Sequence, residues 1–258
     1  MSSSVSPVSF VVESLFRMRI YGINPVLEGL RAGRVTAIRI AARGDDRFIQ
    51  LLRLAEDKGI TVTRVTPGEL DRLSRGAAHQ GVVAEARLGE HIGVEDLIVR
   101  AKGVPLIVVL DGIEDPHNVG AILRTVDAAG ADGVVRQSRR AARLDGAAAK
   151  ASAGAVAHVP VAEVVNIARA LETLKDAGVW TVGLDGDAPT RYDDVDFTLP
   201  TALVVGAEGS GLRRLVRERC DWLVSIPRLG HVQSLNVSVA TGIALFEALR
   251  QRARKPVR

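Results

Sequence analysis

The sequence predicts an α/β protein in two parts: a small α/β unit, followed by a larger unit with a mostly parallel sheet. Three observations support this prediction. The chain has 258 residues, which is long for one small domain and sufficient for two. Only 3% of its residues are aromatic against 47% that are hydrophobic, so aliphatic side chains must form the core. Continuous apolar runs alternate with segments of helical spacing, which is typical of strands joined by helices.

The small unit is expected at residues 19–88, after an N-terminal extension at 1–18. Its helices and strands alternate in the order αβαβαβ. Thr66 suits a helix N-cap and Pro67 suits the first helical position, so a helix is expected to begin there. The helices are expected at 24–30, 48–57 and 66–73, and the strands at 37–41, 60–65 and 81–86.

The larger unit is expected at residues 105–258, after a linker at 89–104 that contains one helical turn near Gly93–Val99. Its first strand, 105–110, is apolar throughout, as expected of a parallel strand buried on both faces. The other strands are expected at 133–135, 180–184, 202–205 and 222–226, and the helices at 119–129, 147–151, 167–177, 212–217 and 237–252. This alternation predicts a mostly parallel sheet covered by helices on both faces.

Charge and cysteine content limit the class of protein. The net charge of +4 fits a polyanionic partner without proving one. Cys220 is the single cysteine, so there is no disulfide framework or cysteine-based metal site, and we expect a buried or half-buried thiol in a reducing compartment. No apolar run reaches the roughly 18 residues of a membrane span, and the serine-rich start does not resemble a signal peptide. We therefore expect a cytoplasmic protein that holds no metal.

Ligands of open parallel sheets bind at the carboxyl ends of the strands, so the loops there are the candidate sites. The loop after the first strand contains Asn118, a good helix N-cap, and Arg124, six residues further on. A cation this close to a strand end needs a partner such as a phosphate or carboxylate. The alternative is a surface arginine whose stem packs on the core.

Two later loops have a similar composition. Residues 206–211 contain three glycines, which indicates unusual backbone angles or close backbone approach to a ligand. This loop has neither a P-loop ending nor a nucleophile elbow, and Glu208 suits a ligand contact or a loop contact. Further along, Ser234 and Asn236 lie where a loop becomes a helix, which suits either a ligand site or plain helix capping.

Taken together, the three loops resemble the SpoU/TrmH branch of the SPOUT methyltransferases. The resemblance rests on the segments 115–124, 205–211 and 225–240, which occur in the family's order and spacing. It extends to the first unit, where 21–26 and 78–81 look like the ends of an L30e-like RNA-binding domain. The sequence is most similar to members that methylate the 2′-hydroxyl of a guanosine in 23S ribosomal RNA.

The resemblance implies a C-terminal domain with a trefoil knot, formed by residues 221–249, that binds S-adenosylmethionine mainly through its main chain. The implied donor contacts are Val205, Gly206, Gly211, Ile226 and Leu235. The implied catalytic residues are Asn118, Arg124, Glu208, Ser234 and Asn236. The family assigns proton removal to the arginine that matches Arg124. Because the pKa of arginine lies above about 12, positioning of the substrate phosphate is the other role open to it.

The resemblance also implies an RNA partner and a homodimer whose site is completed across the interface. Candidate RNA contacts are Tyr21, Asn24, His79, Gln80, Arg136 and Arg139. The last two belong to the basic run 136–143, for which a solvated loop is the alternative. Arg228 and His231 depart from the family pattern and suit extra phosphate contacts or simple exposure.

The predicted C-terminal helix has apolar residues for a dimer face or, equally, for packing within the chain: Val237, Ile243, Ala244, Ala248 and Leu249. Two functional alternatives stay open. One is a 2′-O-methyltransferase that acts on tRNA or on another ribosomal RNA. The other is a non-catalytic RNA-binding protein of ribosome assembly.

Overall fold

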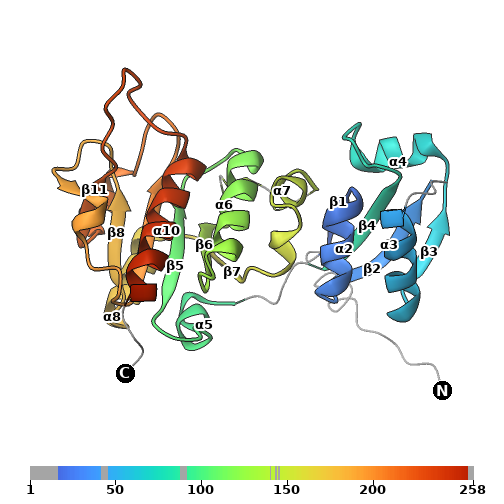
Figure 1. Cartoon of the computed structure of the whole chain (residues 1–258), viewed down its shortest axis with the longest axis horizontal. Helices are drawn as coiled ribbons and strands as arrows, with labels where there is room; N and C mark the ends of the chain where they lie inside the picture. Colours follow the sequence, from blue (N-terminus) through green and yellow to red (C-terminus); the bar gives the residue numbers. More distant parts are fainter. Residues whose placement is uncertain are drawn as a thin grey trace. The chain divides into compact units, whose positions relative to one another are not determined.

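A computed structural model describes residues 17–41, 46–87, 92–139, 141–142, 144 and 146–254 (Figure 1). Most of the N-terminal extension, part of the expected linker, and Arg140 and Arg143 of the basic run lie outside the described residues. Contacts divide the chain into two units. One contains the first 90 residues together with Leu144–His158, and the other contains His91–Arg143 and Val159–Arg258.

The larger unit has a seven-stranded sheet in the order β7-β6-β5-β10-β8-β11-β9, and all its pairs are parallel. Its strands are β5 (Leu106–Asp111), β6 (Gly133–Gln137), β7 (Val161–Val164), β8 (Trp180–Leu184), β9 (Thr190–Arg191), β10 (Thr201–Gly206) and β11 (Trp222–Ser225). The predicted α/β class with a mostly parallel sheet is confirmed. The strands β7 and β9 were not predicted from the sequence.

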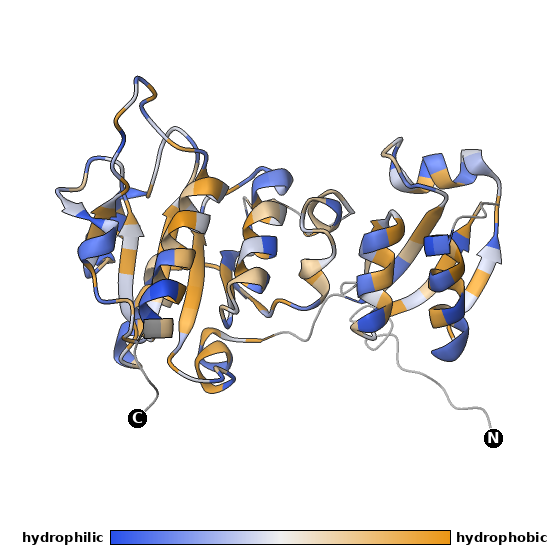
Figure 2. Ribbon diagram, in the orientation of Figure 1, coloured by the Kyte–Doolittle hydropathy of each residue, from blue (hydrophilic) through white to orange (hydrophobic). Residues whose placement is uncertain are grey.

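Helices cover both faces of this sheet because its central strands are apolar on both sides. Every residue of β5 is buried, and Figure 2 shows most of that strand in orange, since all its residues except the last, Asp111, are apolar. The helices α6 (Pro116–Ala128) and α10 (Val237–Arg254) pack together on one face. On the other face, α8 (Ile167–Asp176) contacts both α5 (Val94–Val99) and α9 (Arg214–Arg219). The helical turn expected in the linker is α5.

The smaller unit has a four-stranded sheet in the order β1-β4-β2-β3. Its elements are β1 (Arg17–Tyr21), α2 (Ile23–Arg31), β2 (Val35–Ile40), α3 (Asp46–Asp57), β3 (Thr61–Arg64), α4 (Pro67–Ser74) and β4 (Val82–Arg87). The six predicted elements are present, and the Thr66 side chain caps α4 by accepting from the Glu69 amide. Strand β1 was missed because it has two arginines in five residues and is stabilised by antiparallel pairing with the distant β4.

The helix expected at 147–151 forms, as α7 (Gly146–Ala151), but it packs with the smaller unit. Ala149 belongs to the apolar core around α2 and β2. Gly146 lies so close to Tyr21 that a Cβ there would be 1.9 Å from a ring carbon. A short 3-10 turn, η1 (Ala155–Ala157), follows, and the His158 ring then hydrogen-bonds to Glu28 at 3.0 Å. A single domain boundary in the sequence therefore assigns this segment to the wrong unit.

Cys220 is half-buried and donates from Sγ to the Val216 carbonyl at 3.3 Å. Burial, with a smaller effect from the Asp221 charge, raises the pKa of the Cys220 thiol to about 12. We expect iodoacetamide at pH 8 to alkylate Cys220 at least about 100-fold more slowly in the folded protein than in urea, because the thiolate is the nucleophile. Mass spectrometry of timed samples measures both rates. Equal rates in the two states would contradict this assignment.

Among the described residues, no helix is long and apolar enough to cross a membrane.

Candidate functional site

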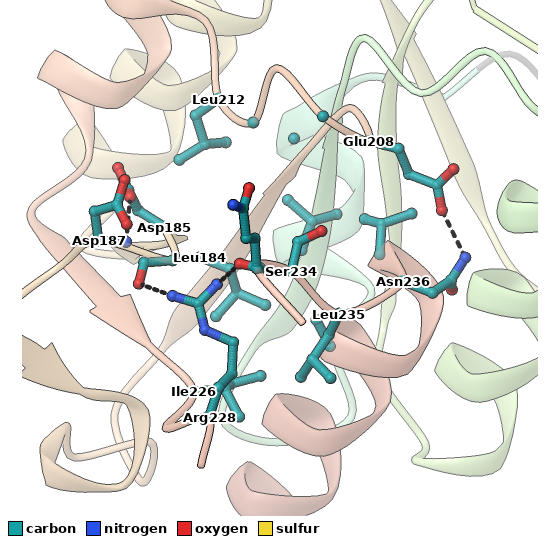
Figure 3. A pocket seen from close by; sticks show the side chains of 18 of the residues that line it. Leu184, Asp185, Asp187, Glu208, Leu212, Ile226, Arg228, Ser234, Leu235 and Asn236 are labelled. Atoms are coloured by element: carbon teal, nitrogen blue, oxygen red, sulfur yellow. Dashed lines mark hydrogen bonds between the residues drawn. The ribbon is translucent and has the colours of Figure 1, made fainter. Parts of the chain in front are cut away.

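The three loops singled out in the sequence converge at the carboxyl ends of β5, β10 and β11. A cavity of about 1260 Å³ lies there, lined mainly by the loops after β8, β10 and β11 and by the start of α10 (Figure 3). All five predicted donor contacts line this larger cavity: Val205, Gly206, Gly211, Ile226 and Leu235. Of the five predicted catalytic residues, Glu208, Ser234 and Asn236 line it as well.

Gly206 ends β10 where the glycine-rich loop folds back on the strand. A Cβ at this position would lie 2.2 Å from the Gly211 carbonyl carbon and 2.4 Å from the Leu212 nitrogen. Ala207 and Gly211 exchange two backbone hydrogen bonds, of 3.1 and 2.9 Å, which hold the loop in this turn. Only glycine therefore fits at 206, and the wall of the cavity there is main chain. A cradle of this kind suits a ligand that is recognised by backbone groups.

Asn236 joins the three loops through one side chain. Its Oδ1 accepts from the Ser238 amide at 2.9 Å and so caps α10. Its Nδ2 donates to Asn118 Oδ1 at 2.9 Å and to Glu208 Oε1 at 2.6 Å, and Figure 3 shows this last bond at one side of the cavity. The helix amides fix which end of the amide is oxygen, so Nδ2 must face the other two residues. Asn236 therefore caps α10 and also holds Asn118 and Glu208 in place.

The sequence predicts Asn118 as the N-cap of α6, and this prediction is wrong. The cap is Asp115, whose Oδ1 accepts from the His117 amide at 2.9 Å. Asn118 lies in the first turn, where its buried side chain is free to accept the bond from Asn236.

Asp111 and Arg213 form an ion pair that was not predicted from the sequence. Asp111 is fully buried at the end of β5 and accepts from the Arg213 amide at 2.8 Å and from its Nε at 2.7 Å. The pair ties the end of β5 to the loop that follows β10. The sequence signal that could have indicated an ion pair here is an acidic residue directly after an apolar strand, because a buried carboxylate requires a partner. Its partner is 102 residues away in the sequence.

Arg228 spans two loops on the far side of the larger cavity. Its guanidinium donates to the Gly186 carbonyl at 2.8 Å and to the Gln233 carbonyl (Figure 3). These donors are used within the chain, which weakens the idea of a phosphate contact. His231 is exposed at the rim of the same cavity. Nearby, burial tends to raise the pKa of Asp185. The hydrogen bonds from Arg217, at 2.5 Å, and from the Asp187 amide, together with the charge of Arg217, outweigh burial and lower that pKa.

A second, smaller cavity of about 510 Å³ adjoins the first. The two share Ala207, Glu208, Ser210 and Gly211 as a common wall. The other residues that line the smaller cavity are Asp111, Gly112, Ile113, Glu114, Asp115, Asn118, Gln137 and Arg213. The network of Asn118, Glu208 and Asn236 therefore stands at the boundary between the two cavities.

Arg124 is not brought into either cavity. Its side chain is exposed on α6 and makes no hydrogen bond or ion pair with any residue that the structure describes. In its own chain Arg124 is therefore separate from the polar network that contains the other predicted catalytic residues.

Arg136, a predicted RNA contact, is buried in the structure and is not presented to a partner. The sequence predicts that the strand ends at Val135, but β6 continues to Gln137, so Arg136 lies inside the sheet and is only 5% exposed. Its guanidinium donates to the Ala142 carbonyl and lies 3.7 Å from a Glu163 oxygen. Desolvation lowers the pKa of Arg136, and Glu163 opposes this effect.

Three other candidate RNA contacts have structural partners. The Gln80 side chain accepts from the Ile23 amide at 3.0 Å, and the His79 ring lies between the Gly81 amide and Asp71. Tyr21 is half-buried against α4 and α7. Asn24 and Arg139 are exposed. Among the described residues, no group of three or more His, Cys, Asp or Glu side chains is arranged to hold a metal ion.

Two family models match the chain. The SpoU rRNA Methylase family matches residues 105–246, and a model described as RNA 2′-O ribose methyltransferase substrate binding matches residues 19–91.

Individual proteins match over nearly the whole chain. The 23S rRNA (guanosine-2′-O-)-methyltransferase RlmB of Pseudomonas syringae pv. tomato is 45% identical over 243 residues, which cover 92% of this chain and 97% of that protein. The crystal structure of the SpoU methyltransferase AviRb from Streptomyces viridochromogenes, in complex with AdoMet, has a TM-score of 0.80 at 27% identity and covers 94% of this chain and 93% of its own. An AdoMet-bound rRNA methyltransferase from Sinorhizobium meliloti has a TM-score of 0.77 at 25% identity, covering 97% of each chain.

Proposed function

Because the chain belongs to the SpoU rRNA methylase family, whose members are S-adenosylmethionine-dependent RNA 2′-O-methyltransferases, we propose that it methylates the ribose 2′-hydroxyl of a guanosine in 23S ribosomal RNA. The observation that carries the proposal is the polar network of Asn236, Glu208 and Asn118 at the boundary of two adjoining cavities. A relative named for this substrate aligns over 92% of the chain.

The reaction forms a bond between the ribose oxygen and the methyl carbon, breaks the bond from that carbon to sulfur, and releases the hydroxyl proton. The donor, when bound, supplies a methyl group already activated by a positive sulfonium. The larger cavity, called the donor cavity from here on, suits this donor. Its wall at Gly206 is main chain, which fits a donor bound mainly through backbone groups, and Ile226 and Leu235 line the same cavity. The chain's own contribution is to hold the 2′-hydroxyl in line with the methyl group.

We assign four residues to the ribose side of the site: Asn118, Glu208, Ser234 and Asn236. Asn236 holds Asn118 and Glu208 within hydrogen-bond distance of its own amide, so this part of the site is preorganised. Ser234 is exposed on the wall of the donor cavity and is available to a ligand. Arg124 binds the substrate phosphate in this proposal, as a cation with a free guanidinium suits.

The active form we propose is a homodimer in which Arg124 reaches the site of the other protomer. The predicted apolar face of α10 is divided: Val237, Ala244 and Ala248 are buried within the chain. Other apolar side chains of α10 are exposed: Val239, Phe246 and Leu249. α10 packs against α6, the helix that carries Arg124, so these exposed side chains and Arg124 belong to neighbouring helices.

The smaller unit selects the RNA in this proposal, as the family model for substrate binding over residues 19–91 supports. A ribosomal RNA substrate also favours the cytoplasm as the place of action.

Incubation of the purified protein with tritiated S-adenosylmethionine and separate samples of unmodified 23S RNA, 16S RNA and tRNA tests the proposal. We expect label in 23S RNA only, and ribose-methylation mapping should locate it at one guanosine. Label confined to tRNA would show that the protein is a tRNA 2′-O-methyltransferase instead. No label in any RNA, together with no donor binding by calorimetry, would leave the non-catalytic RNA-binding alternative.

A further inference from the structure

We propose that the smaller cavity holds the base of the target nucleotide and that Glu114 and Gln137 select guanine there. In this inference the two side chains accept hydrogen bonds from the N1–H and 2-amino groups of the base. It rests on the proposed methyl transfer to RNA and adds to it a base-reading site, which lies on the opposite side of the shared wall from the donor.

The charge of the smaller cavity excludes a phosphate. Its lining carries four carboxylates, from Asp111, Glu114, Asp115 and Glu208, and one arginine, Arg213. An excess of acceptors and negative charge repels a phosphate and favours a ligand edge rich in hydrogen-bond donors. Ligand sites commonly have volumes of about 300–1,000 Å³, and this cavity, at about 510 Å³, lies within that range.

Glu114 is the carboxylate of this cavity with no bond to another described residue. Asp111 is paired with Arg213, Asp115 caps α6, and Glu208 accepts from Asn236. Glu114 is exposed on the loop between β5 and α6, and no hydrogen bond or ion pair joins it to the part of the chain that the structure describes. A carboxylate has two oxygens, so it can accept from two neighbouring N–H groups at once.

Gln137 supplies the second, independent observation. It is the last residue of β6, it lines the cavity, and it is only 9% exposed. Its Oε1 is buried and has no hydrogen-bond partner. A buried acceptor without a partner destabilises a fold, so its presence indicates a role in binding. The terminal torsion of glutamine is soft, which allows rotation of the amide to turn Oε1 toward an incoming donor.

The pattern of acceptors distinguishes guanine from adenine. The edge of guanine carries N1–H next to the 2-amino group, whereas adenine has an unprotonated N1 at the first position and no 2-amino group. Glu114 therefore gains two charge-assisted bonds from guanine and faces an acceptor in adenine. The shared wall at Ala207–Gly211 keeps the base beside the donor cavity, and the ribose between them meets the Asn236 network.

Single-turnover methylation of an RNA fragment that contains either guanosine or inosine at the target position tests this inference. Inosine retains N1–H and lacks the 2-amino group. We expect the wild-type rate to fall about 10- to 100-fold with inosine, as for a lost bond to a charged group. Glu114→Gln should lose about as much with guanosine and clearly less with inosine, because only one of the two bonds that the substitution weakens, the one from N1–H, is present with inosine. Glu95→Gln, an exposed change of the same kind on α5, is the matched control and should behave as the wild type.

Gln137→Leu distinguishes a role of Gln137 in base binding from a role in stability, because the two roles predict different melting temperatures. Replacement of an unsatisfied amide by an apolar side chain of similar shape should leave the melting temperature unchanged or raise it, while guanosine methylation falls. A lower melting temperature with unchanged preference for guanosine would overturn the role of Gln137.

Several results would overturn the role of Glu114. They are an unchanged rate in Glu114→Gln, an equal loss with guanosine and inosine, or weaker donor binding, which would mean that this cavity holds part of the donor. If the wild type methylates no RNA at all, the proposed function fails instead. The two failures are therefore distinguished by the wild-type guanosine reaction.

Discussion

A heterodimer with Arg124→Ala in one protomer and Asn236→Ala in the other is expected to recover about half of the wild-type methylation rate, because a twofold dimer holds two equivalent sites. Each homodimeric variant is expected to be about 1000-fold slower than the wild type, as for the loss of a preorganised group that acts on the transition state. Two inactive proteins should thus form one active enzyme.

The reason for this expectation is the separation of the two residues within one chain. Asn236 stands at the boundary of both cavities, whereas Arg124 is exposed and lines neither. If Arg124 serves the partner's site, the protomer with Arg124→Ala keeps an intact Asn236 and receives Arg124 from the other protomer. Co-expression with two affinity tags and tandem purification gives the pure heterodimer for the assay.

A second heterodimer has the opposite expected result and serves as the control. When both substitutions are in one chain and the partner is wild type, each site lacks one residue, so this heterodimer should be inactive. If Arg124 instead acts in its own chain, the two results exchange places: the mixed heterodimer is inactive, and the control has half activity. Calorimetry with S-adenosylmethionine checks that the Arg124→Ala chain still binds donor.

Gly206→Ala is expected to weaken donor binding by at least about 100-fold and to abolish methylation, because overpacking of this kind costs about 3 kcal/mol. The added methyl group would lie 2.2–2.4 Å from main-chain atoms of Gly211 and Leu212, which a side-chain rotation cannot relieve. The glycine-rich loop must move, and with it the wall shared by both cavities. Calorimetric titration of the donor measures the effect.

Gly103→Ala is the matched control for this substitution. A Cβ at Gly103 meets no atom within 4 Å, so donor affinity and methylation should remain as in the wild type. Circular dichroism melting of both variants shows whether each is folded. A folded Gly206→Ala protein with wild-type donor affinity would remove the main-chain cradle from the binding site.

The parallel sheet was predictable because its central strands are short apolar runs between helical segments. Strand β5 is buried on both faces, and its sequence is apolar until Asp111. Strands β7 and β9 were not predictable in this way, since β7 contains a glutamate and β9 has only two residues. Such strands form because a neighbouring strand offers hydrogen bonds, which local sequence does not reveal.

The site was predictable as a set of loops, and its internal contacts were not. Asn236 was identified at a helix start, but its bonds to Asn118 and Glu208 join residues 118 and 28 positions away. Arg136 was assigned to a basic loop because its type suggests solvent, whereas two further residues of strand place it inside the sheet. Long-range pairing decides such cases, and a single sequence contains no direct signal of it.

The segment Leu144–His158 means that the chain passes between the two units three times rather than once. A gene that lacks the first 90 residues would still encode α7. The side chains of Ala148 and Ala149, which are buried in the full chain, would then lose the core of the first unit. Proteolysis near residue 90 would likewise leave the fragments held together by this segment. Exchange of the smaller unit between related proteins therefore requires two grafts, one of the first 90 residues and one of Leu144–His158.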